Sequence, residues 1–557
     1  MARTGQVAAI SPHFESTYGK RPTDVKYRYT WIAPLAVSPR PPHALFAASQ
    51  YLWRSADRGH SWTMVSPDLT GAVPDTKGCG DEISIRNARP CGFGVIFSIA
   101  LSPSSDDDIW IGTDDGRIQT TRDGGKAWRD VTPAGLSPWS KVSALDIPPF
   151  DAGTVYAAID RQRLDDFTPH VYRTHDGGQT WTEIVAGLPR DGFVSVVRAD
   201  PVRRGLLYAG TDTGVFVSFT DGEEWQPLQL NLPTTWVRDL LVHGNDLIAA
   251  TQGRALWILD DVAPLRQMTT ETAKRGAFLF PPSDAWRQRR NQNRDTPLPP
   301  ETPLGKNPPE GALLDYFLGA SARGPVTLEI IDSKGSPVRR FSSDEPPPSP
   351  NAARYFAEGW LKPEAPPATS AGHHRFLWDL RYPRPQAPRY EYSMSAIWGE
   401  GTPLQPEGAL ALPGQYSVRL AVDGQSFTQP LMLRMDPRVR VTPESIVEQF
   451  EAARRASSLL DRSWAALEEI RAFRKRLLAA GRRPLATALE KEAAELEEGE
   501  GGFARLNARL AAVLRAIDGS DGAPTAQAMT ELDTAGTDFA ALLVRQRKLG
   551  SPDGRSR

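Results

Sequence analysis

Residues 174–181 read Thr-His-Asp-Gly-Gly-Gln-Thr-Trp, and their pattern Ser/Thr-x-Asp-x-Gly-x-x-Trp recurs in the first half of the chain. It returns at residues 55–62 and 121–128, and a degenerate copy at residues 218–225 has Thr220 in place of the Asp. Asp and Ser/Thr side chains hydrogen-bond to the backbone of their own loop, and Gly adopts the positive φ that such a turn requires. The pattern therefore predicts a repeated tight turn between two antiparallel strands, closed by a tryptophan.

Apolar runs of strand length surround each of these turns in the same order. The closing tryptophans of the four turns are 66, 53 and 44 residues apart, namely Trp62, Trp128, Trp181 and Trp225. Repeats of this size, each with four antiparallel strands, are typical of β-propeller blades. A fifth unit at residues 246–261 lacks the turn. We therefore predict a mainly β protein with five recognisable propeller blades in residues 1–265; the alternative is a larger propeller of which these five are a part.

The repeated turn is the Asp-box, or BNR repeat. Together with residues 210–215 (GTDTGV) and 252–261 (QGRALWILDD), the boxes resemble those of the bacterial BNR/sortilin-like proteins that are often labelled glycosyl hydrolases. Residues 375–381 and 413–420 are similar to the C-terminal part of that family. The resemblance implies an exported propeller protein that takes up a glycan or a peptide. Members are usually longer at the front, with a signal peptide and more blades.

Composition excludes several classes of partner. The chain of 557 residues has 65 basic and 67 acidic side chains, so its net charge of −2 gives no nucleic-acid footprint. The sequence contains no run of about 18 apolar residues, so we predict no membrane-spanning helix. The first residues lack the basic and apolar regions of a signal peptide, which by itself indicates the cytoplasm. The family resemblance instead predicts a periplasmic or extracellular parent protein.

Two cysteines, Cys79 and Cys91, lie in one polar insertion. They either close a small disulfide or remain two unpaired thiols, and their spacing leaves both open. No His or further Cys lies at ligand spacing, so we expect no metal and no cofactor.

The carboxylates of the boxes, Asp57, Asp123 and Asp176, are expected to be structural, because the box turn lies on the face opposite the loops between blades. On that other face, one aromatic residue precedes or opens the innermost strand of each blade: Trp31, Phe93, Trp139, Phe193 and Trp236. If the blades close, these rings gather at the mouth of the central channel and bind a sugar or an apolar peptide side chain. The alternative is ordinary packing between blades.

Turns on the same face carry acidic and basic residues. Glycoside hydrolysis needs two carboxyl groups, about 5 Å apart for retention and roughly 6.5 to 9.5 Å apart for inversion. The candidate pair is Asp114 or Asp115 with Asp165 or Asp166, and the candidate ligand-binding arginines are Arg161, Arg163 and Arg254. The alternative is that these residues form ordinary hairpin turns and solvated loops.

The second half predicts further domains. Residues 266–311 form a Pro-rich linker, residues 312–440 an Ig-like antiparallel β-sandwich, and residues 441–550 a helical hairpin or bundle that begins at Thr442 and Pro443. Residues 551–557 are expected to be a disordered tail. Three functions follow: a binding or scaffold protein, a glycoside hydrolase, or an assembly module that meets a protein partner through the C-terminal helices.

Overall fold

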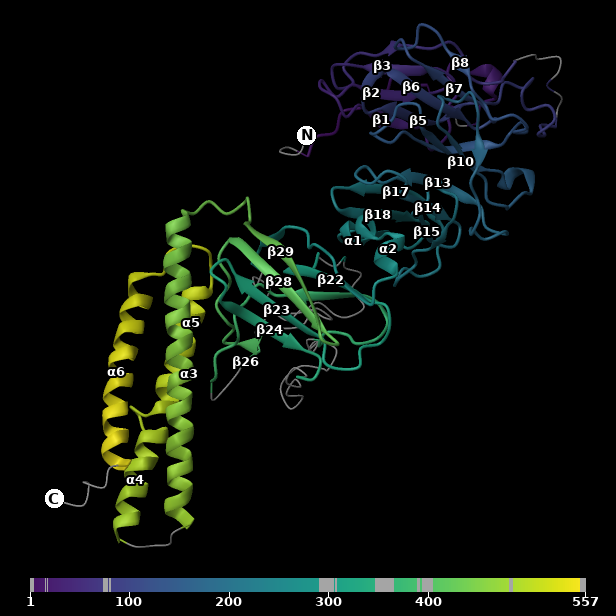
Figure 1. Cartoon of the computed structure of the whole chain (residues 1–557). Helices are drawn as coiled ribbons and strands as arrows, with labels where there is room; N and C mark the ends of the chain where they lie inside the picture. Colours follow the sequence, from purple (N-terminus) through teal and green to yellow (C-terminus); the bar gives the residue numbers. More distant parts are fainter. Residues whose placement is uncertain are drawn as a thin grey trace. The chain divides into compact units, whose positions relative to one another are not determined.

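The computed structural model describes residues 5–15, 17, 19–73, 79, 82–289, 305, 308–345, 365–387, 391–392, 404–479 and 484–550. The chain divides into two compact units, Met1–Arg266 and Gln267–Arg557, which are described separately below (Figure 1). The division falls one residue after the predicted end of the propeller part, residue 265.

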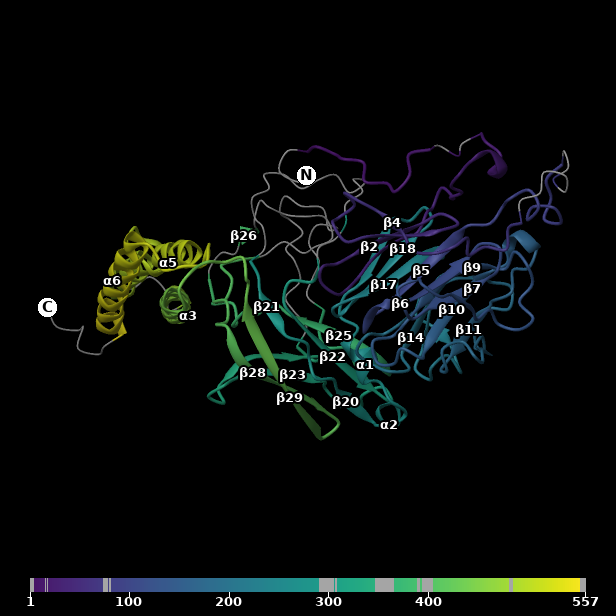
Figure 2. The same ribbon diagram turned by 90° about the horizontal axis from the view of Figure 1, so that it is seen from above.

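In its described residues, the first unit contains five small antiparallel sheets that follow one another along the chain, here called blades 1 to 5 (Figures 1 and 2). Blade 1 contains β1 (Leu35–Val37), β2 (Leu45–Ala48), β3 (Leu52–Ser55) and β4 (Thr63–Met64). Blade 2 contains β5 (Ile96–Ser102), β6 (Ser105–Thr113), β7 (Ile118–Thr121) and β8 (Arg129–Asp130). Blade 3 contains β9 (Lys141–Asp146), β10 (Val155–Asp160), β11 (Val171–Thr174) and β12 (Thr182–Glu183).

Blade 4 contains β13 (Val194–Ala199), β14 (Leu207–Thr211), β15 (Val215–Ser218) and β16 (Gln226–Pro227). Within the described residues, blade 5 has three strands, β17 (Val237–His243), β18 (Asp246–Thr251) and β19 (Leu256–Leu259). In every blade the strands are hydrogen-bonded in chain order. This up-and-down arrangement is that of propeller blades.

The hydrophobic core of this unit lies between the blades. Val142 and Leu145 of blade 3 belong to one buried cluster with Trp110 of blade 2. The approach is so close that a Cβ on Gly112 would lie 2.3 Å from Cγ1 of Val142. Glycine at this position therefore permits blades 2 and 3 to stack.

The repeated turns adopt one hydrogen-bonded geometry. The Thr174 hydroxyl donates to the Asp176 carboxylate at 2.8 Å and accepts from the Gly178 N–H at 3.0 Å. Asp176 also accepts from the Thr180 hydroxyl at 2.6 Å and from its N–H at 2.9 Å. These bonds, the Thr180 hydroxyl foremost, lower the pKa of Asp176 to about 2. Asp176 thus organises the turn as an ionised acceptor.

The other copies of the turn follow the same plan. Ser55 donates to Asp57 at 2.8 Å, and Thr121 donates to Asp123 at 2.8 Å. Hydrogen bonds also lower the pKa of both carboxyls. In the degenerate copy, the Thr220 hydroxyl accepts from the Glu224 N–H at 3.0 Å and so replaces one carboxylate oxygen.

The tryptophan that closes each turn joins its blade to the preceding blade. Three indole N–H groups donate to a backbone carbonyl: Trp128 to Val65 at 3.4 Å, Trp181 to Val131 at 2.7 Å and Trp225 to Ile184 at 2.8 Å. Each acceptor directly follows the outermost strand of the preceding blade. In blade 1, Trp62 donates to the carbonyl of Ile10 at 2.8 Å.

The second unit begins with two sheets that share one core. The three-stranded sheet has the order β20-β22-β25, with bounds Ala277–Leu279, Ala312–Leu318 and Gly372–Trp378. The five-stranded sheet has the order β21-β29-β28-β23-β24, with bounds Ala285–Arg287, Gln425–Met435, Gly414–Val422, Thr327–Asp332 and Pro337–Ser342. Tyr316 of the first sheet and Val418 of the second are fully buried in the same cluster. A two-stranded ribbon, β26 (Glu391–Tyr392) and β27 (Leu404–Gln405), completes this part.

Two features differ from the predicted linker and antiparallel sandwich. Strands β20 and β21 both lie within the predicted linker, and β21 pairs with β29 in parallel. Its Arg287 is 1% exposed, because its guanidinium donates to the Ala411 carbonyl and pairs with Asp521. A segment that composition assigns to solvent is therefore part of the sheet. Residues 290–304, 306–307 and 551–557 lie outside the described residues.

Four helices follow the sheets: α3 (Pro443–Ala479), α4 (Pro484–Glu498), α5 (Phe503–Asp518) and α6 (Ala526–Gly550). They bury a common apolar cluster that includes Leu460, Leu467 and Leu510 (Figure 1). Two short helices, α1 (Ala263–Gln267) and α2 (Thr270–Ala273), lie near the division between the units. In the part of the chain that the structure describes, no helix has the length and hydropathy needed to cross a membrane.

Candidate functional site

Three loops of the first unit surround one pocket of about 480 Å³, here called the loop pocket. The loops precede β5, precede β9 and follow β10, so they come from blades 2 and 3. The third loop contains the 3-10 helix η2 (Gln162–Leu164). The lining residues are Ile85, Arg86, Arg89, Ser137, Pro138, Trp139, Arg161 and Leu164.

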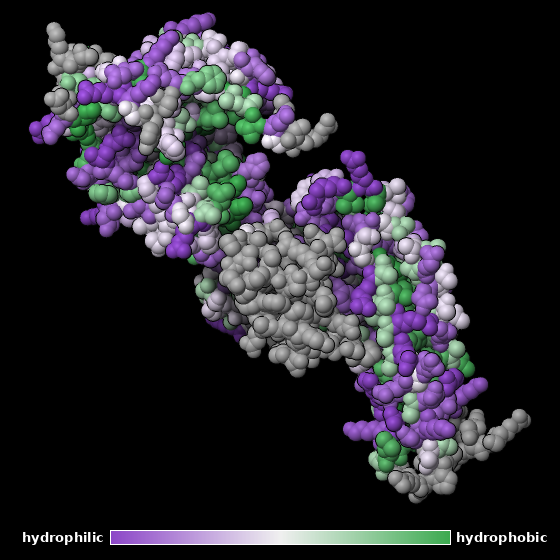
Figure 3. All heavy atoms as spheres, turned by 180° about the vertical axis from the view of Figure 1, so that it is seen from behind, coloured by the Kyte–Doolittle hydropathy of each residue, from purple (hydrophilic) through white to green (hydrophobic). Residues whose placement is uncertain are grey.

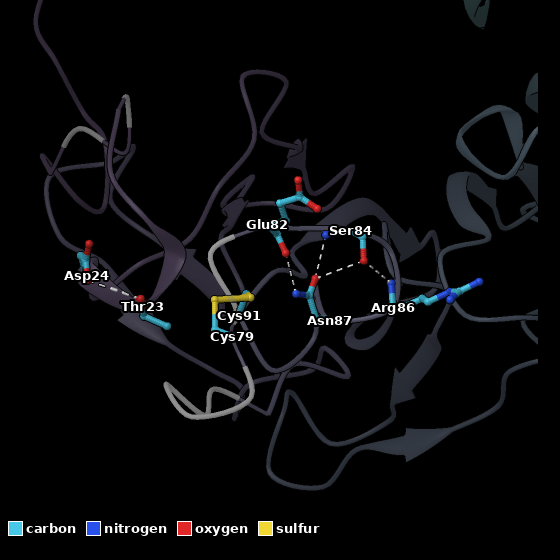
Figure 4. Close-up of a disulfide and its surroundings, with 8 residues drawn as sticks. All are labelled: Thr23, Asp24, Cys79, Glu82, Ser84, Arg86, Asn87 and Cys91. Carbon is cyan, nitrogen blue, oxygen red and sulfur yellow. Dashed lines mark hydrogen bonds between the residues drawn. A yellow bond between two sulfur atoms is a disulfide. The ribbon is translucent and has the colours of Figure 1, made fainter.

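The first loop is closed by a disulfide between Cys79 and Cys91 (Figure 4). Within it, the Asn87 carboxamide accepts from the Ser84 N–H at 2.7 Å and donates to the Glu82 carbonyl at 2.8 Å. The Cys91 N–H donates to the Asn87 carbonyl at 3.0 Å. Arg86 is exposed and points away from the disulfide (Figure 4). This bonding presents three pocket residues, Ile85, Arg86 and Arg89, from one turn of chain.

Trp139 joins that loop to blade 3. Its indole N–H donates to the Ile85 carbonyl at 3.1 Å, and its backbone N–H donates to the Asp115 carbonyl at 2.9 Å. Its φ of 68° is uncommon for a residue with a side chain, and such strain gathers at functional sites. Trp139 is 6% exposed and lines the pocket, where its ring forms part of the wall.

The charges of the pocket are mainly positive. Arg89 pairs with Asp115 at 3.4 Å, and Arg161 pairs with Asp166 at 3.2 Å. Arg161 also donates to the Ser137 hydroxyl at 3.3 Å. With the exposed Arg86, three guanidinium groups line a pocket whose lining contains no acidic side chain. Arginine in such a position binds carboxylate or phosphate groups through paired hydrogen bonds.

The four candidate catalytic carboxylates occupy different environments. Asp115 is fully buried and accepts from the Thr113 hydroxyl at 2.6 Å and from the Gly71 N–H at 2.7 Å. Since its backbone carbonyl also accepts from Trp139 and from Arg89, Asp115 positions the pocket wall and does not face a substrate. Asp165 is an exposed residue in the left-handed conformation that ends η2.

Asp114 and Asp166 have opposite electrostatic situations. Burial raises the pKa of Asp114, which accepts from the Val95 N–H at 2.8 Å and pairs with Arg163 at 3.3 Å. The Thr168 hydroxyl, at 2.6 Å, is the foremost of the groups that lower the pKa of Asp166 to about 2. The Arg163–Asp114 pair shows that the β6–β7 turn of blade 2 adjoins the η2 loop of blade 3.

The predicted aromatic residues are not equivalent. Phe193 is 5% exposed and packs edge to face against Trp236, with ring centroids 5.2 Å apart. The Arg238 guanidinium covers Trp236 at 4.1 Å. Phe93 is half-buried, whereas Trp31 is 93% exposed. For Trp139 and Phe193, the structure favours packing between loops and blades over an open stacking surface.

Of the predicted ligand-binding residues, Trp139 and Arg161 line the loop pocket. Arg163 contacts Asp114 beside it, and Arg254 lies exposed in a hairpin of blade 5. Ile85, Arg86, Arg89, Ser137, Pro138 and Leu164 were not predicted. One signal for the first three was available, since they lie between the two cysteines of the polar insertion. Among the described residues there is no group of three His, Cys, Asp or Glu side chains that could hold a metal ion.

No family model matches the chain, and no curated protein matches it. Among solved structures, the chain is similar to a GH74 xyloglucanase from Xanthomonas campestris, with 20% identity over 44% of this chain and 38% of that chain and a TM-score of 0.32. It is also similar to YCF48 bound to D1 peptide, with 19% identity over 30% of this chain and 51% of that chain and a TM-score of 0.24. A third similar structure is an ancestral GH74 enzyme, with 13% identity over 73% of this chain and 47% of that chain and a TM-score of 0.29. The chain spans about half or less of each, and likenesses of this size do not assign an activity.

Proposed function

We propose that the first unit is a binding module whose loop pocket holds a peptide segment that carries a carboxylate. The observation that carries the proposal is the lining of the pocket, in which Arg86, Arg89 and Arg161 surround apolar groups of Ile85, Leu164 and Trp139. A carboxylate would pair with the guanidinium groups, and an adjoining apolar side chain would contact the hydrocarbon surface.

A glycan is the second candidate ligand. Sugar rings stack on exposed aromatic faces, but Trp139, the aromatic residue that lines the pocket, is 6% exposed. The carboxylate of an acidic sugar could still pair with the arginines of the pocket. The lining therefore favours a peptide over a neutral glycan.

Family and compartment belong to the same proposal. The repeated turns and residues 210–215 and 252–261 support membership of the BNR/sortilin-like family, and the two sheets of the second unit fit its predicted Ig-like sandwich. The Cys79–Cys91 disulfide supports an oxidising compartment, hence an exported parent protein.

A glycoside hydrolase remains the alternative function. Its support is the contrast between Asp114, whose pKa is raised by burial, and Asp166, whose pKa is lowered to about 2. Such a contrast is what a general acid and an ionised partner need. Hydrolysis of a polysaccharide that is abolished in Asp114→Asn, but not in Asp165→Asn, would favour this alternative.

The test is binding of the purified chain to peptide and glycan arrays, followed by affinity measurement on the best ligand. We expect Arg86→Ala and Arg161→Ala each to weaken binding about tenfold, because each removes hydrogen bonds to a charged group. Arg254→Ala is the matched control, since Arg254 is exposed on the same unit and does not line the pocket. Equal loss in Arg254→Ala, or unchanged affinity in both pocket variants, would contradict the proposal.

A further inference from the structure

One histidine of blade 3 lies between two carboxylates. Nδ1 of His170 is 2.9 Å from the Glu183 carboxylate, and Nε2 is 3.1 Å from the Asp166 carboxylate. Hydrophilic side chains cover much of the visible surface of the first unit (Figure 3), and isolated ion pairs on a surface contribute little. His170 differs from such residues, because its side chain is 14% exposed and both of its ring nitrogens face an anion.

The hydrogen bonds of His170 require two ring protons. An ionised carboxylate accepts hydrogen bonds and does not donate, so each ring nitrogen has to carry its own proton. The Thr168 hydroxyl lies 3.1 Å from Nε2 but does not supply a proton to it, because it donates to Asp166 at 2.6 Å. A neutral imidazole has a single N–H and would lose one of the two bonds. The arrangement is therefore that of a positively charged imidazolium.

Asp166 connects His170 to the loop pocket. Its Oδ2 lies 3.1 Å from Nε2 of His170 and 3.2 Å from Nη1 of Arg161, which lines the pocket. Nη2 of Arg161 donates to the Ser137 hydroxyl at 3.3 Å. Nε of Arg161 is buried and has no hydrogen-bond partner in the part of the chain that the structure describes. The guanidinium is thus held at two nitrogens and keeps one unpaired donor for a ligand.

The protonation of His170 sets the positive charge that Arg161 presents. When His170 is charged, Asp166 is shared between two cations, so the three groups together carry one net positive charge. When His170 is neutral, Asp166 neutralises Arg161 and the net charge of the three groups is zero. The side chains of Arg161 and Asp166 are 26% and 24% exposed, so solvent screens this difference less than it would at an open surface.

We propose that the loop pocket binds its carboxylate ligand in a proton-coupled manner, with high affinity when His170 is charged and lower affinity when His170 is neutral. This inference rests on the proposed function of the pocket as a carboxylate site. Histidine is the side chain that ordinarily titrates between pH 5 and 8, so a change of pH within this range would regulate the site. By linkage, the bound carboxylate favours the charged form of His170.

The neighbouring ionisable groups do not change charge in this range, with one exception. Hydrogen bonds, that of the Thr168 hydroxyl foremost, lower the pKa of Asp166 to about 2. Burial raises the pKa of Tyr172, so its phenol stays neutral. The exception is Asp114, which pairs with Arg163 beside the pocket and whose pKa is raised by burial. Ionisation of Asp114 would also weaken the binding of an anion as pH rises, so it needs a separate control.

The experiment uses N-acetyl-leucine as the probe, because it has one carboxylate and one apolar side chain. An α-carboxyl group of this kind stays ionised from about pH 5.5 to 8. Ligand-observed NMR measures its affinity for the full chain at steps across this range, with N-acetyl-leucinamide as the uncharged control. We expect affinity to be about fivefold higher at the acidic end, which is the lower limit of typical coupling between two sites. Equal affinity across the range overturns the coupling and leaves the proposed function standing, whereas absence of binding at every pH overturns both.

Two variants assign the pH dependence to its residue. His170→Gln keeps a hydrogen-bond donor but gains no charge, so its affinity should be the same at both ends of the range. Asp114→Asn should retain the fivefold difference. His60→Gln is the matched control and should also retain it, because His60 is exposed in the repeated turn of blade 1 and does not line the pocket. Loss of the difference in Asp114→Asn, or its persistence in His170→Gln, would overturn the role of His170.

A second variant tests the same role without changing the histidine. Glu183→Gln removes one of the two carboxylates that favour the charged ring, and the Glu183 side chain is 43% exposed, so the fold should tolerate the change. The fall in affinity should then occur at lower pH than in wild type. A fall at the same pH as in wild type would overturn the proposal.

Discussion

At the scale of single residues, one hydroxyl organises each repeated turn. Thr174 is 2% exposed, and its Oγ1 accepts from the Gly178 N–H while donating to Asp176. Ser55, Thr121 and Ser218 accept from the equivalent glycine. In the fourth copy Thr220 replaces the aspartate, yet the hydroxyl of Ser218 is retained. The hydroxyl is therefore the constant element of the turn.

Thr174→Val should test that role. The substitution keeps the shape but leaves the buried N–H of Gly178 without its acceptor, which costs about 1 to 3 kcal/mol. We expect the free energy of unfolding of the first unit to fall by that amount, which thermal unfolding measures as a lower melting temperature. Thr180→Val is the control, because Thr180 is exposed and its hydroxyl contacts one oxygen of Asp176. A larger effect in the control would show that the aspartate dominates.

Asp114 gives a pH dependence of known sign. Burial raises its pKa in the folded state above the ordinary value of 3.8, so the folded protein holds this proton more tightly than the unfolded chain. The resulting stabilisation is complete below pH 3.8 and is lost as pH rises through the raised pKa. Asp114→Asn removes this dependence. The free energy of unfolding of the variant and of wild type is measured from pH 3 to 7. The value for the variant should increase relative to that of wild type as pH rises. A difference that does not change with pH would contradict this prediction.

At the scale of elements, periodic segments were predictable and isolated pairings were not. The four-strand repeats and the helix that begins at Pro443 follow from local patterns of apolar residues. Strand β21 did not, because three residues in a Pro- and Arg-rich segment carry no period. Arg287 is buried by partners 124 and 234 residues away in sequence, Ala411 and Asp521. Such partners become visible once the chain is folded.

The buried pair of Arg287 with Asp521 connects the five-stranded sheet to the segment between α5 and α6. Asp521→Asn would leave the buried guanidinium with a weaker partner, and loss of one member of a buried pair costs about 3 to 5 kcal/mol. In urea unfolding of the second unit, the free energy of unfolding should fall by an amount that approaches this range. Asp533→Asn is the control, since its pair with Arg455 is exposed and worth less than about 1 kcal/mol. Similar losses in both variants would contradict the buried role.

The disulfide loop is the second element whose effect is measurable. Cys79 and Cys91 enclose the segment that supplies Arg86 and Arg89 to the loop pocket. Replacing both by serine frees a loop whose closure is typically worth about 2 to 4 kcal/mol. We expect weaker ligand binding with unchanged circular dichroism, checked by titration of wild type and variant. Unchanged affinity would show that the hydrogen bonds of Asn87 suffice to hold the loop.

At the scale of the whole molecule, the sequence predicted the order of parts better than the candidate site. Trp139 and Arg161 were identified from their loops. Asp115 was one of two alternatives for one member of the candidate carboxyl pair, and its oxygens accept from Thr113 and Gly71 inside the fold. Residue type shows that a carboxylate can do chemistry, whereas burial and partners decide whether it is available. These depend on which loops adjoin, and a single sequence does not contain that information.

The division into two units predicts independent folding. Expressed separately, residues 1–268 and 269–557 should each unfold cooperatively, because each has its own buried clusters. Calorimetry of the two pieces and of the whole chain checks this. A piece without a cooperative transition would contradict the division. The cut is placed after residue 268 so that helix α1 stays intact.

The link from each closing tryptophan to the preceding blade has an evolutionary consequence. Its acceptor is a main-chain carbonyl, which every amino acid provides, so the junction tolerates any side chain that fits beneath the glycine. A gene segment that runs from one turn to the next encodes both a donor and an acceptor. After duplication or deletion of such a segment, each closing tryptophan still has a backbone carbonyl of a preceding blade as its acceptor. The number of blades can therefore change during evolution without further substitutions at the contacts between blades.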